Sequence, residues 1–425
     1  MRQIPFPWAS LACALLWSSN SFGMPTPTQG VRPVLVSQGS SSDALKKGAE
    51  AMAAKQPDQA RRHFEAALRN DPKQVAAMLG LAELAFQSRN DGETLKWLQQ
   101  AERSAPQRAE VQAALGRFYM ARKQPEKGEP ALRKAIDLDP KPLRPRLDLA
   151  DALMRRGAEA EALPLLKSAV AQDPKLLGAQ LALGQLQQRM GAAAEADKTL
   201  RAAAELEPKS ALPWLMLARA QKSAAGALPL LEQALQRQSE HYDALMLRAY
   251  WQMESRDASA ARETLARAAK ADAKAAEPLV RLGLLEEQAG QRSEARRQYL
   301  VAIERDPYHP VALNNLVMMG LTDKEDPARL ELMAKRAVKA LPGNAQVLDT
   351  LALVQRQRKD KTGALASAQA AVKLDPKDAG LMLTLAEMQL WNGDREAARR
   401  SAALVQQLKP APALDARLRD LLSRI

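Results

Sequence analysis

The side chains that could carry metal or nucleophilic chemistry are few in this sequence. The three histidines are His63, His241 and His309, and the only cysteine is Cys13. A metal site or a catalytic triad needs several such groups to converge in space. The elements that hold these residues therefore decide whether any such chemistry is available.

Carboxylates and phosphate-binding loops give no stronger sign of catalysis. Glu286 and Glu287 are adjacent, but paired carboxylates act as general acid and base only where a cleft shifts a pKa. We interpret these two as charges on a helix face, with nothing to raise a pKa. Neither a GxGxxG nor a GxxxxGK[ST] loop occurs in the chain. The sequence thus predicts a protein that is not an enzyme, without a metal or a cofactor.

Prolines at a constant spacing indicate the elements. They lie 34 residues apart in the first half of the chain and resume near the C-terminus, as Pro72, Pro106, Pro140, Pro174, Pro208, Pro307, Pro342, Pro376 and Pro410. A fixed period of this length is the signature of a repeat architecture. With each proline at position 32, about eleven units fill residues 41–410. Because proline cannot continue a helix, it ends the second helix of each unit that has it, and two of the units lack it.

Small side chains recur at two positions of the unit. Position 8 holds Gly48, Ala82, Gly116, Ala150, Gly184, Ala218, Ala249, Gly283, Val317, Ala352 and Ala386. Position 27 holds Ala67, Ala101, Ala135, Ala169, Ala203, Ala234, Ala268, Ala302, Ala337, Ala371 and Val405. Small residues let two helices approach closely, and mid-unit breaks such as Arg156-Gly157 separate two helices in each unit. Each unit is therefore predicted to be a helical hairpin.

These features resemble the tetratricopeptide repeat family, in which Leu-Gly, Tyr, Ala, Phe or Leu, Ala and Pro recur at matching offsets. The resemblance implies an all-α fold, a right-handed superhelical solenoid of about eleven helix-turn-helix units over residues 41–410. Residues 411–425 are expected to form an amphipathic capping helix. Units of such a solenoid touch only their neighbours, so no two of the histidines are expected to share a metal ion.

The segments before the array have a different composition. Residues 1–23 have the layout of a secretory signal peptide cleaved near Gly23, with Arg2 before an apolar stretch of roughly ten residues. That stretch is shorter than the about twenty residues of a membrane span, so the mature chain is predicted to have no integral span. Residues 24–40 are expected to form a flexible leader. The alternatives are an unremoved N-terminus or a lipoprotein acylated at Cys13.

Two segments of the array depart from the repeat. The sixth unit is short and the seventh also lacks the terminal proline, so irregularity is expected near residues 223–275. The ninth unit has Val317 where a small residue belongs, followed by the sequence LTDKEDP. Local irregularity is therefore expected near residues 317–330 as well.

The resemblance also implies which residues line a concave groove, namely positions 2, 5, 9, 12 and 13 of each first helix. In units three to six the candidates are Arg117, Arg144, Asp151, Arg155, Arg189, Arg219 and Lys222. This largely basic set is expected to bind carboxylates of a partner. In later units the candidates are Tyr250 and Met253, and Asn314 and Asn315, which could hydrogen-bond a peptide backbone. The competing interpretation is solvated charge and polar helix faces in an Arg-rich protein.

The net charge of +13 favours anionic partners at long range. Lys and Arg form no run interleaved with aromatic residues, so nucleic acid is not expected. The repeat and the export signal together predict a periplasmic or secreted scaffold or adaptor of the bacterial envelope, whose protein partners carry acidic segments. The stretch GAAAEADKTLRAAAELEP resembles repeat segments of exopolysaccharide export machineries. The alternative is a periplasmic chaperone or assembly factor for pilus, outer-membrane-protein or cytochrome maturation.

Overall fold

The structure is a computed structural model that describes residues 42–425. The predicted signal peptide, the predicted leader and Cys13 lie outside the described residues, and the expectations for them stay predictions. The described residues form twenty-three α-helices and no strand, which confirms the predicted all-α class. They divide into two compact units between Ala220 and Gln221, which we call the N-terminal unit (residues 42–220) and the C-terminal unit (residues 221–425).

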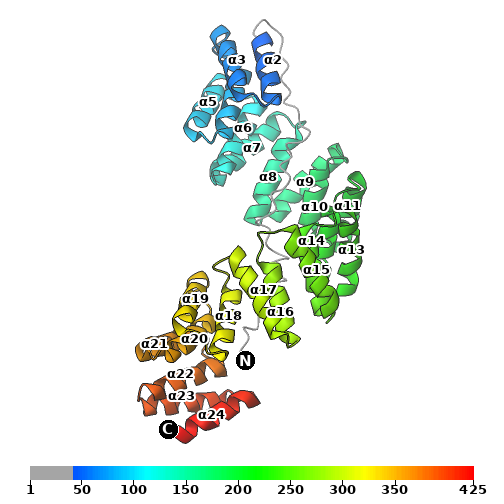
Figure 1. Cartoon of the computed structure of the whole chain (residues 1–425). Helices are drawn as coiled ribbons and strands as arrows, with labels where there is room; N and C mark the ends of the chain where they lie inside the picture. The colour runs from blue at the N-terminus through cyan, green and yellow to red at the C-terminus, as the bar shows by residue number, and fades with distance from the viewer. Residues whose placement is uncertain (1–41) are drawn as a thin grey trace. The chain divides into compact units, whose positions relative to one another are not determined.

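The helices of each unit follow one another in hairpins (Figure 1). The N-terminal unit contains α2 (Ser42–Ala53), α3 (Pro57–Asn70), α4 (Val75–Gln87), α5 (Asp91–Ser104), α6 (Ala109–Ala121), α7 (Pro125–Leu138), α8 (Leu143–Arg156), α9 (Glu159–Gln172), α10 (Leu177–Arg189), α11 (Ala193–Leu206) and α12 (Leu212–Arg219). The even-numbered helices α2 to α10 open the hairpins, and each contacts the next even-numbered helix. These first helices therefore form a continuous layer, with the second helices behind it.

The C-terminal unit repeats this arrangement. It contains α13 (Ala224–Arg237), α14 (Tyr242–Glu254), α15 (Ala258–Ala271), α16 (Glu277–Gln288), α17 (Arg292–Arg305), α18 (Pro310–Thr322), α19 (Pro327–Ala340), α20 (Ala345–Gln357), α21 (Lys361–Leu374), α22 (Ala379–Trp391), α23 (Arg395–Gln407) and α24 (Pro412–Arg424). The first helices α18, α20 and α22 are again neighbours, and α24 packs on α22 and α23. Leu418 and Leu421 of α24 are buried in the last hydrophobic cluster.

The close approach of the two helices of a hairpin explains the small residue at position 8. A Cβ atom added to Gly48 would lie 2.6 Å from the ring of Phe64, and one added to Gly116 would lie 2.6 Å from Cγ of Leu132. Phe64 and Leu132 occupy position 24 of the same units and are fully buried. A large side chain from the second helix therefore fills the space that glycine leaves on the first.

Helix lengths vary near the two segments where irregularity is expected, and that expectation stays a prediction. Helix α12 has 8 residues, compared with 13 in α10 and α14. The boundary between the two units directly follows α12, inside the sixth repeat. In the ninth repeat, Val317 is fully buried in α18, and four residues separate the end of α18 from the start of α19 at Pro327.

Candidate partner-binding surface

Groove positions of neighbouring first helices meet along the first-helix layer. In the N-terminal unit, Nη1 of Arg117 on α6 lies 3.9 Å from Oε2 of Glu83 on α4. In the C-terminal unit, Nη1 of Arg356 on α20 lies 3.1 Å from Oε2 of Glu387 on α22. Because these side chains remain partly exposed, the groove positions form a surface rather than part of the core.

The predicted basic residues of the N-terminal unit are largely neutralised by acids of the same chain. Arg144 donates from Nε to Oδ1 of Asp148 at 2.8 Å, one turn along α8. Arg155, whose side chain is 75% exposed, lies 2.6 Å from Asp151. The two predicted groove residues Arg155 and Asp151 thus form an ion pair with each other. The structure gives no dense cluster of cations at these positions.

Arg189 has a structural role at the end of α10. Its guanidinium donates to the carbonyl oxygen of Met154 at 2.9 Å and forms an ion pair with Glu159. These bonds hold α10 against the turn of the preceding hairpin. Arg219 is half-buried at the end of α12 in the N-terminal unit, whereas Lys222 is exposed in the C-terminal unit.

The two candidates on α14 differ in accessibility. Tyr250 is only 7% exposed, and its ring centroid lies 5.1 Å from that of Trp251 in an edge-to-face arrangement. Met253, one turn further along α14, is partly exposed. Of the two side chains, only that of Met253 presents appreciable surface to a partner.

Asn314 and Asn315 lie inside the C-terminal unit, 1% and 4% exposed. Nδ2 of Asn315 donates to the hydroxyl oxygen of Tyr299 at 3.0 Å, and that hydroxyl donates to Oε2 of Glu287 at 2.7 Å. Asn314 donates weakly to Asn315 at 3.4 Å, and its own Oδ1 is buried without a hydrogen bond among the described residues. The amide of Asn315 is thus engaged within the fold.

The structure corrects the interpretation of Glu287 as a helix-face charge with nothing to raise its pKa. Burial raises the pKa of the Glu287 carboxyl, although the hydrogen bond from Tyr299 and the positive charge of Arg292 oppose the shift. Burial, followed by the nearby Glu287 charge, also raises the pKa of the Tyr299 hydroxyl. The sequence could not show this, because the contact joins α16, α17 and α18.

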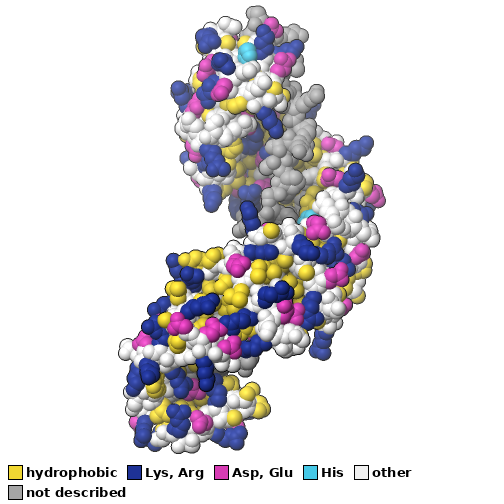
Figure 2. Space-filling model, viewed as in Figure 1, with side chains coloured by type: hydrophobic (Ala, Val, Ile, Leu, Met, Phe, Trp, Pro, Cys, Tyr) yellow, Lys and Arg dark blue, Asp and Glu magenta, His cyan; other side chains and the backbone are white. Residues whose placement is uncertain are grey.

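Apolar side chains occupy several groove positions of the C-terminal unit. Met253, Met318, Leu321, Leu353 and Leu390 all stand at these positions and are all partly exposed. Figure 2 shows hydrophobic side chains gathered over α16 to α18, with Lys and Arg side chains between them. We call these five residues the apolar groove face.

Glu83 and Glu387 are groove residues that the sequence reasoning missed. Both occupy position 9, so the family positions would have found them had they been applied to the second and eleventh units. Glu387 accepts hydrogen bonds from Arg356 at 3.1 Å and from Arg417 of α24 at 2.7 Å. This carboxylate therefore ties the C-terminal helix to the first-helix layer.

The histidines of the C-terminal unit cap helices. Nδ1 of His241 accepts a hydrogen bond from the backbone N–H of Ala244, the third residue of α14. Nδ1 of His309 accepts one in the same way from Ala312, the third residue of α18. Nε2 of His309 also lies 3.3 Å from the carboxylate of Glu277. Burial opposes ionisation of Glu277, but hydrogen bonds from His309 and Arg281 outweigh it and lower the pKa of this carboxyl. Within residues 42–425, no group of three His, Cys, Asp or Glu side chains is placed to hold a metal ion.

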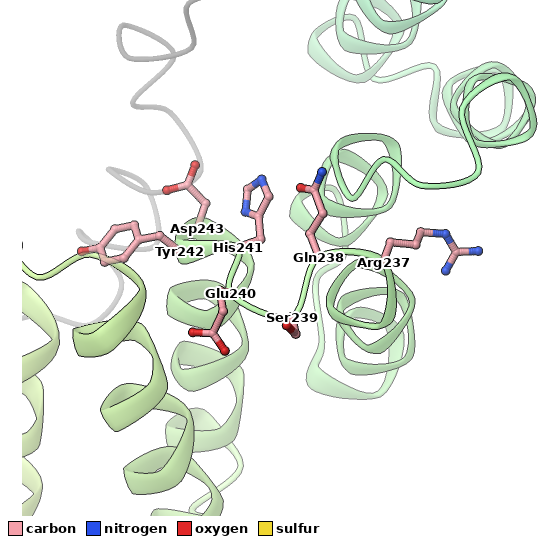
Figure 3. Close-up of a pocket in the computed structure, with 7 residues that line it drawn as sticks. All are labelled: Arg237, Gln238, Ser239, Glu240, His241, Tyr242 and Asp243. Atoms are coloured by element: carbon pink, nitrogen blue, oxygen red, sulfur yellow. The ribbon is translucent and has the colours of Figure 1, made fainter.

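A shallow hollow lies at the turn between α13 and α14 (Figure 3). It is lined by seven consecutive residues, Arg237 to Asp243. Their side chains point in different directions rather than converging on one point. The hollow therefore offers no arrangement of an acid, a base and a nucleophile.

None of the helices in the described part of the chain is long and apolar enough to cross a bilayer.

Comparison with known families decides what these hairpins are. Two family models, both described as tetratricopeptide repeat, match the chain, one at residues 51–118 and 154–220 and the other at residues 113–176. The chain is a tetratricopeptide-repeat protein. Proteins of this family bind other proteins and are generally non-catalytic, which places this tetratricopeptide-repeat protein among the protein-interaction scaffolds. Its handedness and the number of its repeats stay predictions.

One solved structure similar to this tetratricopeptide-repeat protein is the Cut9–Hcn1 hetero-tetramer of the APC/C, with 13% sequence identity and a TM-score of 0.43. The match covers 91% of this chain and 96% of that chain. PilW, a type IV pilus biogenesis factor, has 23% identity over 49% of this chain and 98% of its own, with a TM-score of 0.44. Yeast Tom70 has 13% identity over 90% and 94%, with a TM-score of 0.37. These likenesses are too distant to indicate a partner. No curated protein gave a match.

Proposed function

We propose that this protein is a non-catalytic adaptor of the bacterial cell envelope that binds segments of partner proteins along its first-helix layer. The observation that carries the proposal is the apolar groove face of the C-terminal unit. Its Met and Leu side chains are partly exposed along the first helices α14, α18, α20 and α22. Partly exposed apolar side chains that line a continuous surface favour contact with another macromolecule.

The proposed location rests on the sequence of residues 1–23. A basic residue, an apolar stretch of roughly ten residues and a polar end support export through the inner membrane. Within the envelope, the repeat phrasing GAAAEADKTLRAAAELEP supports a place in an exopolysaccharide synthesis or export assembly. In that setting the protein would hold assembly subunits together and carry no reaction of its own.

A second candidate function is a chaperone for client polypeptides in transit, and the composition of the apolar groove face favours it. Unbranched methionine side chains adapt to differently shaped ligands, as at surfaces that accept many partners. Met253 and Met318 supply such side chains at groove positions of α14 and α18. A dedicated scaffold needs one partner surface, whereas a chaperone needs this adaptability.

The test is a crosslinking pull-down with the mature chain, Met24 onward, from a native envelope extract, followed by mass spectrometry. Reproducible recovery of a few subunits of one assembly, such as polysaccharide synthase or export subunits, supports the adaptor. Recovery of many unrelated unfolded or precursor proteins supports the chaperone instead. If no polypeptide is enriched over a mock purification, the proposed function is wrong.

A matched pair of variants locates the binding surface in the same experiment. Met318→Gln with Leu353→Gln makes the apolar groove face polar with little change in side-chain length. Leu332→Gln is the control, because Leu332 lies on the second helix α19 and is 55% exposed. Partner recovery is expected to fall with the groove pair and to be unchanged with the control.

A further inference from the structure

Every turn inside a hairpin of the described chain, except that between α12 and α13, has a left-handed backbone residue at position 15. Four turns have glycine there, Gly157, Gly191, Gly290 and Gly393, with φ between 75° and 90°. Six turns have a residue other than glycine, and each is basic: Lys55, Arg89, Lys123, Arg256, Lys324 and Lys359, with φ between 55° and 63°. Only one further non-glycine residue of the described chain, Lys409, has a positive φ, and it follows α23.

Backbone preference does not explain this choice of residue. The left-handed region is unfavourable for L-residues, and the exceptions besides glycine are Asn and Asp, whose short side chains bond locally. None of the six positions carries Asn or Asp. A cation near the C-terminus of the first helix is favoured by the helix dipole, but the four glycine turns show that the fold forms without it.

In the N-terminal unit, ion pairs join the turn ends of the second to fifth hairpins, and α2 of the first hairpin contacts α4 of the second. Nη2 of Arg122, in the third turn, lies 2.5 Å from Oδ1 of Asp91, in the second. Arg156, which ends α8 before the fourth turn, lies 3.4 Å from Glu129 of the third hairpin. Arg189 of the fifth hairpin pairs in the same way with Glu159 of the fourth. The turn edge is therefore continuous along this unit.

The same contacts separate two kinds of cation on this edge. Arg122, Arg156 and Arg189 each form an ion pair with an acid of the preceding hairpin, which neutralises them. Lys55, Arg89 and Lys123 are exposed, and no ion pair of theirs occurs among the contacts of residues 42–425. In the C-terminal unit, by contrast, each left-handed cation is followed directly by an acid: Asp257, Glu325 or Asp360.

We propose that Lys55, Arg89 and Lys123 form a docking edge for an extended acidic segment of a partner polypeptide. This inference rests on the proposed function as a protein-binding adaptor and adds a second, electrostatic contact to it. Neighbouring packed helices lie roughly 10 Å apart, so successive cations recur at about the length of three residues of extended chain. A polypeptide with a carboxylate at every third residue or so can therefore meet all three.

The surroundings of the three cations favour an acidic polypeptide over a lipid surface or a nucleic acid. Their immediate neighbours in the sequence are small, polar or basic, namely Ala54, Gln56, Ser88, Asn90, Arg122 and Gln124. An acid follows within three residues in each case, Asp58, Asp91 or Glu126. No large exposed hydrophobic side chain of the described residues belongs to these three turns. Stable binding to a membrane surface needs apolar side chains that insert among the lipids. Single-stranded nucleic acid needs exposed aromatic rings for stacking. A single line of cations with polar spacers has neither.

The test measures binding of a fluorescent peptide with glutamate at every third residue to the mature chain and to the triple variant Lys55→Gly, Arg89→Gly and Lys123→Gly. Glycine is the residue that the protein itself has at the same position of four other repeats, so the thermal midpoint should be unchanged or raised. The dissociation constant should increase by about tenfold, as expected for three exposed ion pairs. The matched control is Arg256→Gly, Lys324→Gly and Lys359→Gly, which should bind like the unmodified chain.

The proposal is overturned if the unmodified chain does not bind the peptide at low ionic strength, or if the triple glycine variant binds it equally well. The chain is expected to bind vesicles with anionic lipid, and an acidic polysaccharide such as alginate, more weakly than it binds the peptide. Stronger binding to either would assign the edge to another occupant and would also overturn the proposal. Partner recovery in the envelope pull-down reports separately on the adaptor. If partners are recovered but the glycine variant recovers them undiminished, the docking edge is wrong while the proposed function stands.

Discussion

Replacement of Gly283 by alanine tests the packing that sets the spacing of the two helices within a hairpin. A Cβ atom at this position of α16 would lie against the ring of Tyr299, 2.7 Å from Cδ1 and 2.8 Å from Cζ. The ring cannot swing away freely, because its hydroxyl donates to Glu287 at 2.7 Å and accepts from Asn315 at 3.0 Å. The added methyl group therefore overpacks a fixed contact.

The expected cost follows from two opposing effects. Overpacking a core costs about 1–3 kcal/mol, and replacing a mid-helix glycine by alanine gains about 1 kcal/mol. Gly283→Ala should therefore destabilise its hairpin by about 1 kcal/mol. The control is Gly116→Ala, which faces Leu132. Because other repeats combine alanine at position 8 with leucine at position 24, that substitution should be neutral or stabilising.

Hydrogen exchange is the suitable assay, because repeat arrays open locally and need not unfold in one step. Amides of α16 and α17 should exchange about fivefold faster in Gly283→Ala, as expected for about 1 kcal/mol. Amides of α6 and α7 should be unchanged or slower in Gly116→Ala. Unchanged exchange in Gly283→Ala, or equal destabilisation by both substitutions, would refute the packing argument.

Three further substitutions test contacts of the C-terminal unit. Burial raises the folded-state pKa of Glu287. The contribution of this carboxyl to stability is therefore full below its unfolded-state pKa and is lost as the pH rises through its folded-state pKa. Glu287→Gln should raise the thermal midpoint more at pH 7 than at pH 4, and a pH-independent difference would contradict this. Glu387→Ala removes the bonds from Arg417 and should expose α24 to proteolysis, at a cost of about 1–2 kcal/mol; protection equal to that of the unmodified chain would contradict the tie. Arg305→Met removes the donor of three hydrogen bonds to backbone carbonyls, at 2.9–3.3 Å. The free energy of unfolding should fall by about 1–3 kcal/mol, which calorimetry would detect as a lower thermal midpoint.

The architecture could be predicted from the sequence because its causes are local. Proline disfavours continuation of a helix, and the 34-residue spacing of the prolines that follow second helices predicted the hairpins before any contact was known. The second helix α3 ends at Asn70, two residues before Pro72. The glycine at position 8 likewise marked a close contact, although only the structure shows that Phe64 or Tyr299 is the side chain that fills it.

The state of the candidate groove residues could not be predicted in the same way. A family position indicates which face a residue lies on, but not which acid of the next repeat reaches it. Arg117 and Glu83 are 34 residues apart and meet because their helices are neighbours. Asn315 is buried because Tyr299 and Glu287 of the preceding hairpin bond it. Charge and burial at these positions depend on contacts between repeats, which a single unit of sequence does not contain.

The most direct measurement of the central claim is site-specific photo-crosslinking in native cells. A photoreactive residue is placed at Met318, in the apolar groove face, or at Leu332, on the second helix of the same hairpin. The account predicts crosslinks to other polypeptides from position 318 and few or none from position 332. Equal crosslinking from both positions, or none from position 318, would contradict binding along the first-helix layer.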